Sequence, residues 1–230
     1  MWVLMLASLL ATDPGQEVKL GVDAYQKGQY STAASHFSNA LRVDPGFLTA
    51  RIYLGISYAA QFKPGSDAPE NLRLADEALA EFQQVLTIDP ENDDAISSIA
   101  NLYYSRKNWE EARDWYYKLT EVDPDDKEPF YTLGVIAWME SSGGQMGSHP
   151  ERKARYLEMV TDGIGNLQRA LEIDPEYDDA MSYLSLLLRE RAGMEESKEE
   201  RDRDIAAAEN WVHKSLEIKK RKRERAPARP

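Results

Sequence analysis

The chain repeats one short phrase that ends in Asp-Pro at four places: LRVDPG, LTIDPE, TEVDPD and LEIDPE. The prolines are Pro45, Pro90, Pro124 and Pro175, so successive phrases lie 45, 34 and 51 residues apart. Because proline cannot continue an α-helix, each Asp-Pro predicts the end of a helix. Recurrence at intervals of this size indicates one supersecondary unit repeated along the chain.

Residues 20–45 align without a gap on residues 99–124, and the aligned positions are small or aromatic. In each half of the unit, apolar or small residues recur at i, i+3 or i+4 and i+7, the spacing of one helical face. One position of the unit always carries a small residue, which lets paired helices approach closely; it is filled by Gly21, Gly55, Ala100, Gly134 and Ser185.

These aligned residues and the 34-residue interval resemble the tetratricopeptide repeat family, and the resemblance covers nearly the whole chain. It implies an all-α fold, a right-handed superhelical solenoid of about five helix-turn-helix repeats. The repeats would cover residues 15–46, 47–91, 92–125, 126–176 and 177–220, with 1–14 before them and 221–230 after them. We expect irregular excursions at 62–71 and 141–150, and a charged crossing at 193–204. The acidic pairs Asp93-Asp94 and Asp178-Asp179 are expected to N-cap the helices that follow them.

The chain offers little that could carry chemistry. It has no cysteine, and its three histidines, His36, His149 and His213, lie far apart, so no local metal-ligand spacing exists. No nucleophile–base signature and no glycine-rich phosphate loop after a strand can be recognised. The acidic runs DPENDD and DPDDKE lack the glycine and distal glutamate of a calcium loop. We therefore predict no catalytic residues, no metal, no cofactor and no small-molecule substrate.

A solenoid of this family presents a concave surface made mainly by the first helix of each repeat, and partners usually bind there. The family register places six candidate partner-binding residues on that surface: Tyr25, Asn101, Tyr104, Tyr131, Val135 and Trp138. The resemblance does not extend to the Lys-Asn-Asn-Lys-Arg set by which some members hold a carboxylate, because only Asn101 matches it.

The predicted function is a non-catalytic scaffold that holds a protein or peptide segment with some positive charge. Packing of the aromatic residues between helices is the alternative for the site. The alternatives for the function are an assembly or structural repeat protein that uses its convex face or its basic end, and an enzyme accessory subunit.

Charge is distributed unevenly along the chain. The net charge is −12, yet residues 214–230 carry eight Lys or Arg against two Asp or Glu. The acidic remainder disfavours nucleic acid as a partner. Trailing into solvent is the favoured expectation for the basic end; the alternatives are folding back on the acidic body and contact with phosphate, acidic lipid or nucleic acid.

The apolar N-terminal stretch MWVLMLASLLA has the length of a signal-peptide core and is too short to span a bilayer. It lacks a preceding Lys or Arg and has a poor cleavage site, so a short capping helix is the alternative. Export from a bacterial cell is the favoured location, with the cytoplasm as the alternative. Any membrane contact is expected only through this leader or the basic end.

Overall fold

A computed structural model describes residues 13–142 and 150–225 of the chain. Every regular element within these two ranges is an α-helix, which confirms the all-α prediction, and they contain no strand. The ten helices are α1 (Pro14–Gln26), α2 (Tyr30–Val43), α3 (Leu48–Ala59), α4 (Pro69–Ile88), α5 (Asp93–Ser105), α6 (Trp109–Val122), α7 (Lys127–Ser142), α8 (Pro150–Ile173), α9 (Asp178–Met194) and α10 (Lys198–Arg225). The apolar leader predicted at residues 1–14 lies almost wholly outside the described residues.

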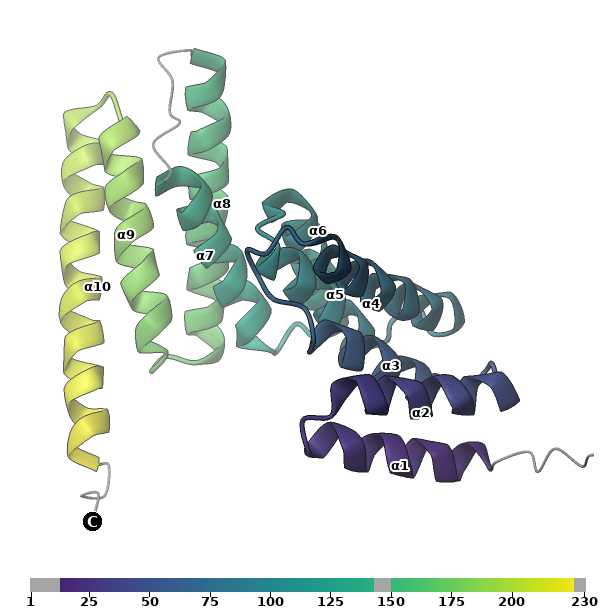
Figure 1. Cartoon of the computed structure of the whole chain (residues 1–230). Helices are drawn as coiled ribbons and strands as arrows, with labels where there is room; N and C mark the ends of the chain where they lie inside the picture. Colours follow the sequence, from purple (N-terminus) through teal and green to yellow (C-terminus); the bar gives the residue numbers. More distant parts are fainter. Residues whose placement is uncertain (1–12, 143–149, 226–230) are drawn as a thin grey trace, which may run out of the picture. The chain divides into compact units, whose positions relative to one another are not determined.

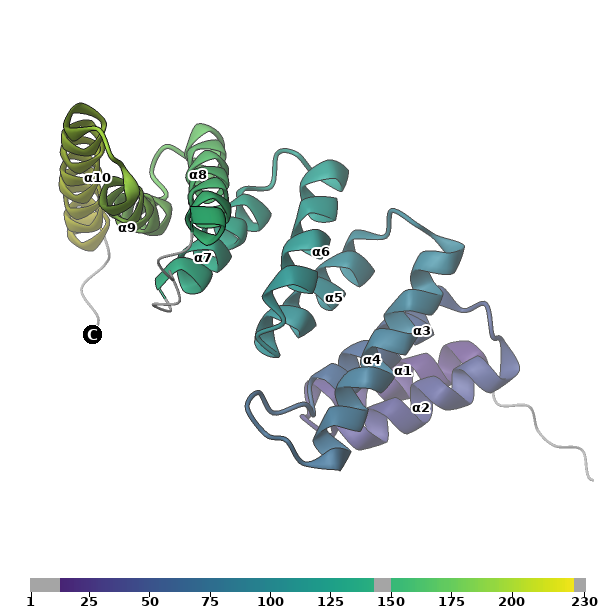
Figure 2. The same ribbon diagram turned by 90° about the horizontal axis from the view of Figure 1, so that it is seen from above.

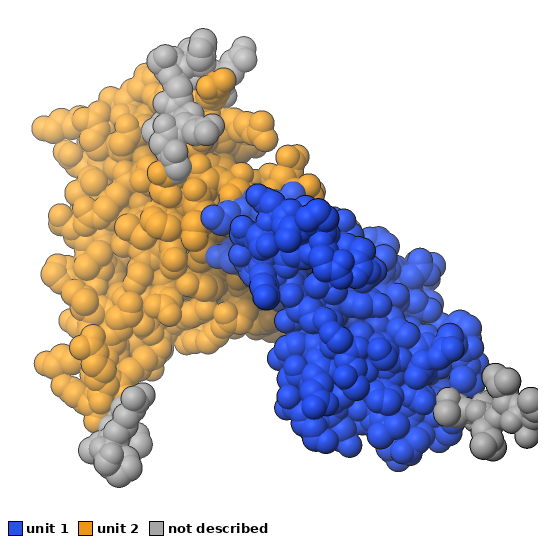
Figure 3. Space-filling view, viewed as in Figure 1, with its two compact units in different colours: residues 1–108 blue, residues 109–230 orange. Residues whose placement is uncertain are grey.

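The chain divides into two compact units (Figure 3). Unit 1 ends at Asn108 and contains α1 to α5, and unit 2 begins at Trp109 and contains α6 to α10. In both units each helix packs against the next one along the chain, as Figure 1 and Figure 2 show for α7 to α10. Such nearest-neighbour stacking of helix pairs is the architecture of a helical repeat solenoid.

The four Asp-Pro phrases mark helix ends, as predicted. Helices α2, α4, α6 and α8 each stop at the residue before an Asp-Pro pair. The aspartate also closes the turn: an oxygen of Asp44 accepts a hydrogen bond from the Gly46 N–H at 3.0 Å, and Asp174 accepts one from the Glu176 N–H at 2.9 Å. The repeated phrase therefore combines a residue that stops the helix with a side chain that satisfies the backbone of the turn.

The predicted N-caps are wrong by one residue. Asn92 caps α5, since its side-chain oxygen accepts a hydrogen bond from the Ala95 N–H at 3.0 Å. Asp93 and Asp94 are the first residues inside that helix, and Asp178 and Asp179 hold the same place in α9 after Tyr177. These carboxylates stabilise the positive end of the helix from within its first turn.

Glycines permit the close approach of paired helices at the predicted position. A Cβ atom on Gly21 would lie 2.6 Å from the Phe37 ring, and one on Gly55 would lie 2.7 Å from the Phe82 ring. In unit 2, a Cβ on Gly134 would lie 2.3 Å from Cγ of Leu167. The first helix of each of these pairs thus makes room for a large buried side chain of the second.

The predicted excursions are more helical than expected. Between α3 and α4 the irregular segment is residues 60–68, because α4 already begins at Pro69. Helix α8 begins at Pro150, so the extra residues there lengthen the return helix, while 143–149 lie outside the described residues. In the charged stretch 193–204, α10 is helical from Lys198 onward. Glutamate, lysine and arginine are good helix formers, and the solvent-facing sides of these helices tolerate them.

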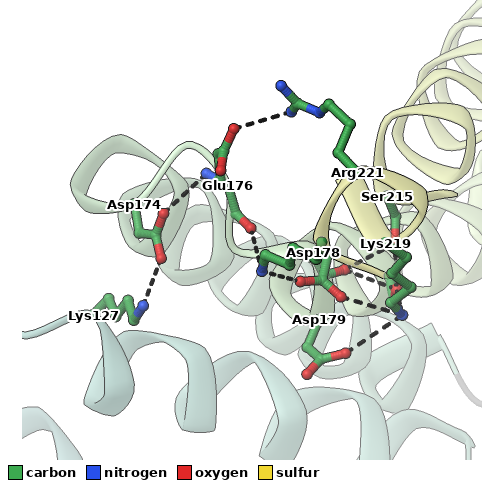
Figure 4. A network of polar contacts seen from close by, with 10 residues as sticks. Lys127, Asp174, Glu176, Asp178, Asp179, Ser215, Lys219 and Arg221 are labelled. Carbon is green, nitrogen blue, oxygen red and sulfur yellow. Dashed lines mark hydrogen bonds and ion pairs between the residues drawn. The ribbon is translucent and has the colours of Figure 1, made fainter. Parts of the chain in front are cut away.

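The basic end of α10 folds back on the turn between α8 and α9 (Figure 4). Lys222 donates hydrogen bonds to the Glu176 carbonyl at 2.9 Å and to the Asp178 carboxylate. Arg221 pairs with Glu176 at 3.1 Å, and Lys219 lies 3.4 Å from Asp179. The described part of the basic end therefore contacts the acidic body, where a tail in solvent was the favoured expectation, and residues 226–230 lie outside the described range.

This network predicts a stability that depends on pH. Burial raises the pKa of Asp178, but the hydrogen bond and charge of Lys222 and the charge of Lys219 outweigh it, so the net pKa is lowered. A hydrogen bond from Lys127 likewise lowers the pKa of Asp174. A carboxyl group with a lowered folded-state pKa stabilises the fold above its unfolded pKa of about 4, and loses that contribution as the pH falls through the folded value.

We therefore expect Lys222→Gln to reduce the free energy of unfolding at pH 7 by about 1 kcal/mol, because the pair is partly exposed. The loss should shrink below a pH of about 4 and at high salt. Lys220→Gln is the matched control, since Lys220 is exposed and its pair with Glu224 spans 3.9 Å. Urea unfolding at both pH values measures the difference. Equal effects of the two substitutions would show that the basic end does not dock on this turn.

Candidate functional site

Unit 1 contains a cavity of about 340 Å³ bounded by its first helices. Tyr25 of α1, Ile56 of α3 and Asn101 of α5 line it, so three successive helix pairs each contribute their first helix. Phe82 of α4 also reaches the cavity from the second helix of its pair. The site is therefore a hollow on the surface where partners are expected to bind a helical repeat array.

The irregular segment 60–68 forms one side of this cavity through Phe62 and Pro64. Asn71, which is buried, holds the segment in place. Its side-chain oxygen accepts a hydrogen bond from the Lys63 N–H at 2.7 Å, and its amide donates to the Lys63 and Ser66 carbonyls at 3.0 and 2.8 Å. The insertion is thus an ordered wall, held by three hydrogen bonds from one residue of α4.

Two of the predicted site residues meet at this cavity. Tyr25 is half-buried, with its ring 5.1 Å from that of Tyr30. Burial, and then the neighbouring hydroxyls of Tyr30 and Tyr53, raise the pKa of Tyr25, so its own hydroxyl stays protonated near neutral pH. Asn101 is exposed on the wall of the cavity. An asparagine amide can both donate and accept, which suits the backbone of an extended segment.

Two further predicted residues meet in unit 2. Tyr131 and Trp138 lie on α7, and both contact Tyr183 of α9, with ring centroids 5.8 and 5.4 Å apart. Tyr131 also contacts Tyr177, at 4.9 Å. Burial and a hydrogen bond to Glu128 raise the pKa of Tyr177. These four half-buried rings form an aromatic cluster between α7 and α9.

The other two predicted residues lie elsewhere. Val135 is 5% exposed and belongs to the core of unit 2, where a partner does not reach it without displacing other side chains. Tyr104 lies near the end of α5 and is half-buried. Phe62 and Pro64 also line the cavity but were not among the predicted residues, although an aromatic residue and a proline in an insertion are a usable signal.

The described residues bear on metal binding and on membrane crossing. Between residues 13 and 142 and between 150 and 225, no three histidine, aspartate or glutamate side chains are grouped to hold a metal ion. None of the helices described is long and apolar enough to cross a membrane. The cavity of unit 1 is lined by apolar side chains and neutral polar groups.

Family models described as tetratricopeptide repeat match residues 18–65 and residues 74–133. These two segments are tetratricopeptide repeats. Over 218 residues the chain is 24% identical to the type IV pilus assembly protein PilF of Pseudomonas aeruginosa. The alignment covers 86% of this chain and 81% of PilF.

Solved structures of tetratricopeptide repeat proteins share the fold. A crystal structure of the MamA protein is similar with a TM-score of 0.67 at 15% identity, covering 94% of this chain and 97% of that one. MamA of Desulfovibrio magneticus RS-1, from residue 41 to its end, has a TM-score of 0.63 at 17% identity, covering 90% of this chain and 95% of that one. YrrB, described as a TPR protein with an unusual peptide-binding site, has a TM-score of 0.59 at 16% identity, covering 90% of this chain and 92% of that one.

Proposed function

We propose that this helical repeat protein is a non-catalytic scaffold that binds a segment of a partner protein on the surface of its first helices. The observation that carries the proposal is the cavity of unit 1, to which α1, α3 and α5 each contribute. A site made by several repeats suits an extended segment, because such a segment can contact one repeat after another.

The chemistry of the cavity suits the backbone and one apolar side chain of such a segment. Ile56, Phe62 and Phe82 supply apolar surface, whose burial contributes about 25 cal/mol per Å². Asn101, Ser98 and Ser105 supply neutral hydrogen-bonding groups on α5. Neutral groups pair with peptide amides and carbonyls without the large desolvation cost of a charge.

In this proposal the aromatic cluster of unit 2 is a second contact surface for the partner. Tyr131 and Trp138 are half-buried, so part of each side chain is exposed to solvent. Rigid aromatic rings give a large contact area at a small loss of conformational entropy, which makes them effective anchors.

The relative named as a type IV pilus assembly protein supplies the first partner candidates. We propose that the bound segment belongs to a component of such an assembly, because the similarity extends over 86% of the chain. Affinity purification from the native source, with mass spectrometry of the retained proteins, would identify the partner.

Once the partner segment is known, we expect Asn101→Ala to weaken its binding about tenfold, because hydrogen bonds to the segment are lost. Ala60→Trp should block the cavity altogether, since Ala60 lies on its wall at the exposed end of α3. Titration calorimetry with the purified segment measures both effects.

Asn210→Ala, at an exposed position of α10, is the matched control and should bind as the parent does. Circular dichroism should confirm that all variants keep the helical signal. Unchanged affinity of Ala60→Trp would reject the cavity and direct attention to the other helices or to the basic end of α10.

A further inference from the structure

Unit 2 contains a second cavity, and none of the residues that line it takes part in the proposed function above. It has a volume of about 490 Å³ and is lined by the start of α6, the end of α7 and the first turns of α8. A smaller cavity of about 330 Å³ adjoins it and shares Glu140, Arg155 and Met159 with it. Pockets of this size are large enough to enclose one or more side chains of a ligand.

The walls of the larger cavity are apolar and adaptable. Trp109, Met139 and Met159 line it, and Met139 is 39% exposed, an unusual position for a large apolar side chain. Methionine is unbranched and polarisable, so it adjusts to side chains of different shapes, and methionine is common at binding surfaces for that reason.

The charged groups of the cavity are only partly compensated. Glu140 is paired with Arg113 at 2.9 Å. Burial raises the pKa of Glu140, although Arg113 and Arg155 oppose this, which indicates that this part of the cavity is shielded from water. Arg152 and Arg155 are exposed at its edge, and neither has a carboxylate within ion-pair distance in the described parts of the chain.

The start of α8 is basic in a chain of net charge −12, although Glu158 and Asp162 line the adjoining cavity. The first six residues of α8, PERKAR, hold three cationic residues and one acidic residue. The amide groups of a first helical turn add further positive potential, so an anion bound here would be stabilised by both.

We propose that this cavity binds a partner-protein segment in which a bulky apolar side chain is flanked by carboxylates. The apolar side chain would lie against Trp109, Met139 and Met159, and the carboxylates would pair with Arg152 and Arg155. The apolar lining and the acidic remainder of the chain favour such a segment over a polyanion such as nucleic acid. This site goes beyond the proposed function, since it lies on other elements than the unit 1 cavity and selects the opposite charge from the one expected for that partner.

The test uses the full chain with methionine methyl groups labelled with ¹³C, so that Met139 and Met159 report directly on the cavity. The probes are two acetylated and amidated peptides, Ser-Glu-Phe-Leu-Glu-Ser and Ser-Gln-Phe-Leu-Gln-Ser. We expect the glutamate peptide to shift both methyl signals and to bind about fivefold more tightly than the glutamine peptide, as two exposed ion pairs allow. The double variant Arg152→Gln/Arg155→Gln should remove that preference.

Lys198→Gln/Arg203→Gln is the matched control, because it removes the same charge from exposed positions of α10 in the same unit. It should keep the preference, and so should Ala60→Trp, which keeps failure of this proposal distinct from failure of the unit 1 site. Three results would overturn the inference: equal binding of both peptides, equal shifts with inorganic phosphate alone, or shifts on concentrating the protein without peptide.

Discussion

Replacing Gly163 with leucine should reduce the free energy of unfolding of unit 2 by about 3 kcal/mol or more, because the interface between α7 and α8 has no room for a side chain there. A Cβ atom on Gly163 would lie 2.5 Å from Cβ of Ala137 and 2.9 Å from Cδ1 of Leu187. The Ala137 methyl group is fixed to the backbone of α7, so it cannot rotate away. The position of a Cβ atom does not depend on the side-chain rotamer, so the two helices must separate to accommodate it.

Gly165, two residues further along α8, provides the control. A Cβ there would meet nothing within 4 Å, and the residue is exposed. Gly165→Leu should therefore stabilise the helix by somewhat less than about 1 kcal/mol, the usual penalty of glycine. Urea unfolding followed by circular dichroism would compare the two. Similar midpoints for both variants would mean that α7 and α8 are further apart at this position than the structure shows.

Helix ends and close contacts were predictable because short-range chemistry determines both. Proline after aspartate stops a helix wherever it occurs, so Pro45 and Pro175 indicate boundaries without any tertiary information. The glycine at the repeated small position, as at Gly21, follows from the size of the partner ring. At Gly163 the family pattern usually has alanine, so the sequence alone left the packing open, and the neighbouring Ala137 shows why a glycine is needed.

The lengths of α8 and α10 were not predictable in the same way. Helix α8 begins at Pro150, the last residue of the excursion expected at 141–150, and α10 begins at Lys198, inside the stretch 193–204 expected as a charged crossing. Charged side chains are compatible with a solvated helix and with a loop, so composition does not separate the two. Partners elsewhere in the chain favour the helix, as where the buried Asp204 of α10 binds Arg191 of α9.

The candidate site was predictable to the extent that it depends on helical register. Tyr25 and Asn101 occupy the expected face of first helices and line one cavity. Val135 lies one turn after Tyr131 on α7, yet it is buried in the core. Tyr131 and Trp138, which precede and follow it, are only half-buried. Phe62 lies in the irregular segment 60–68, which is held by hydrogen bonds with Asn71 of α4. Helical periodicity in the sequence does not reveal such a contact.

Replacing Arg191 with methionine should reduce the free energy of unfolding by about 3 kcal/mol, because it leaves a buried carboxylate without its cation. Arg191 near the end of α9 binds Asp204 of α10 through two parallel hydrogen bonds, of 2.6 and 2.7 Å. The Asp204 side chain is 8% exposed and that of Arg191 is 24% exposed. Because Arg191 is only partly buried, we expect a loss at the lower end of the range of about 3–5 kcal/mol for breaking a buried ion pair. Methionine keeps the helix propensity and most of the aliphatic length.

A double-mutant cycle separates the pair from its surroundings. Asp204→Leu alone should also destabilise, since the guanidinium loses both acceptors, whereas Arg191→Met with Asp204→Leu should recover much of the loss. Arg189→Met, at an exposed position of the same helix, should change little. Additive effects of the two single substitutions would contradict the pairing. A positive coupling would instead show that one buried carboxylate in a run of charged residues fixes α10 against α9, which explains how a stretch that looks entirely solvated can hold the last helix of the array in place.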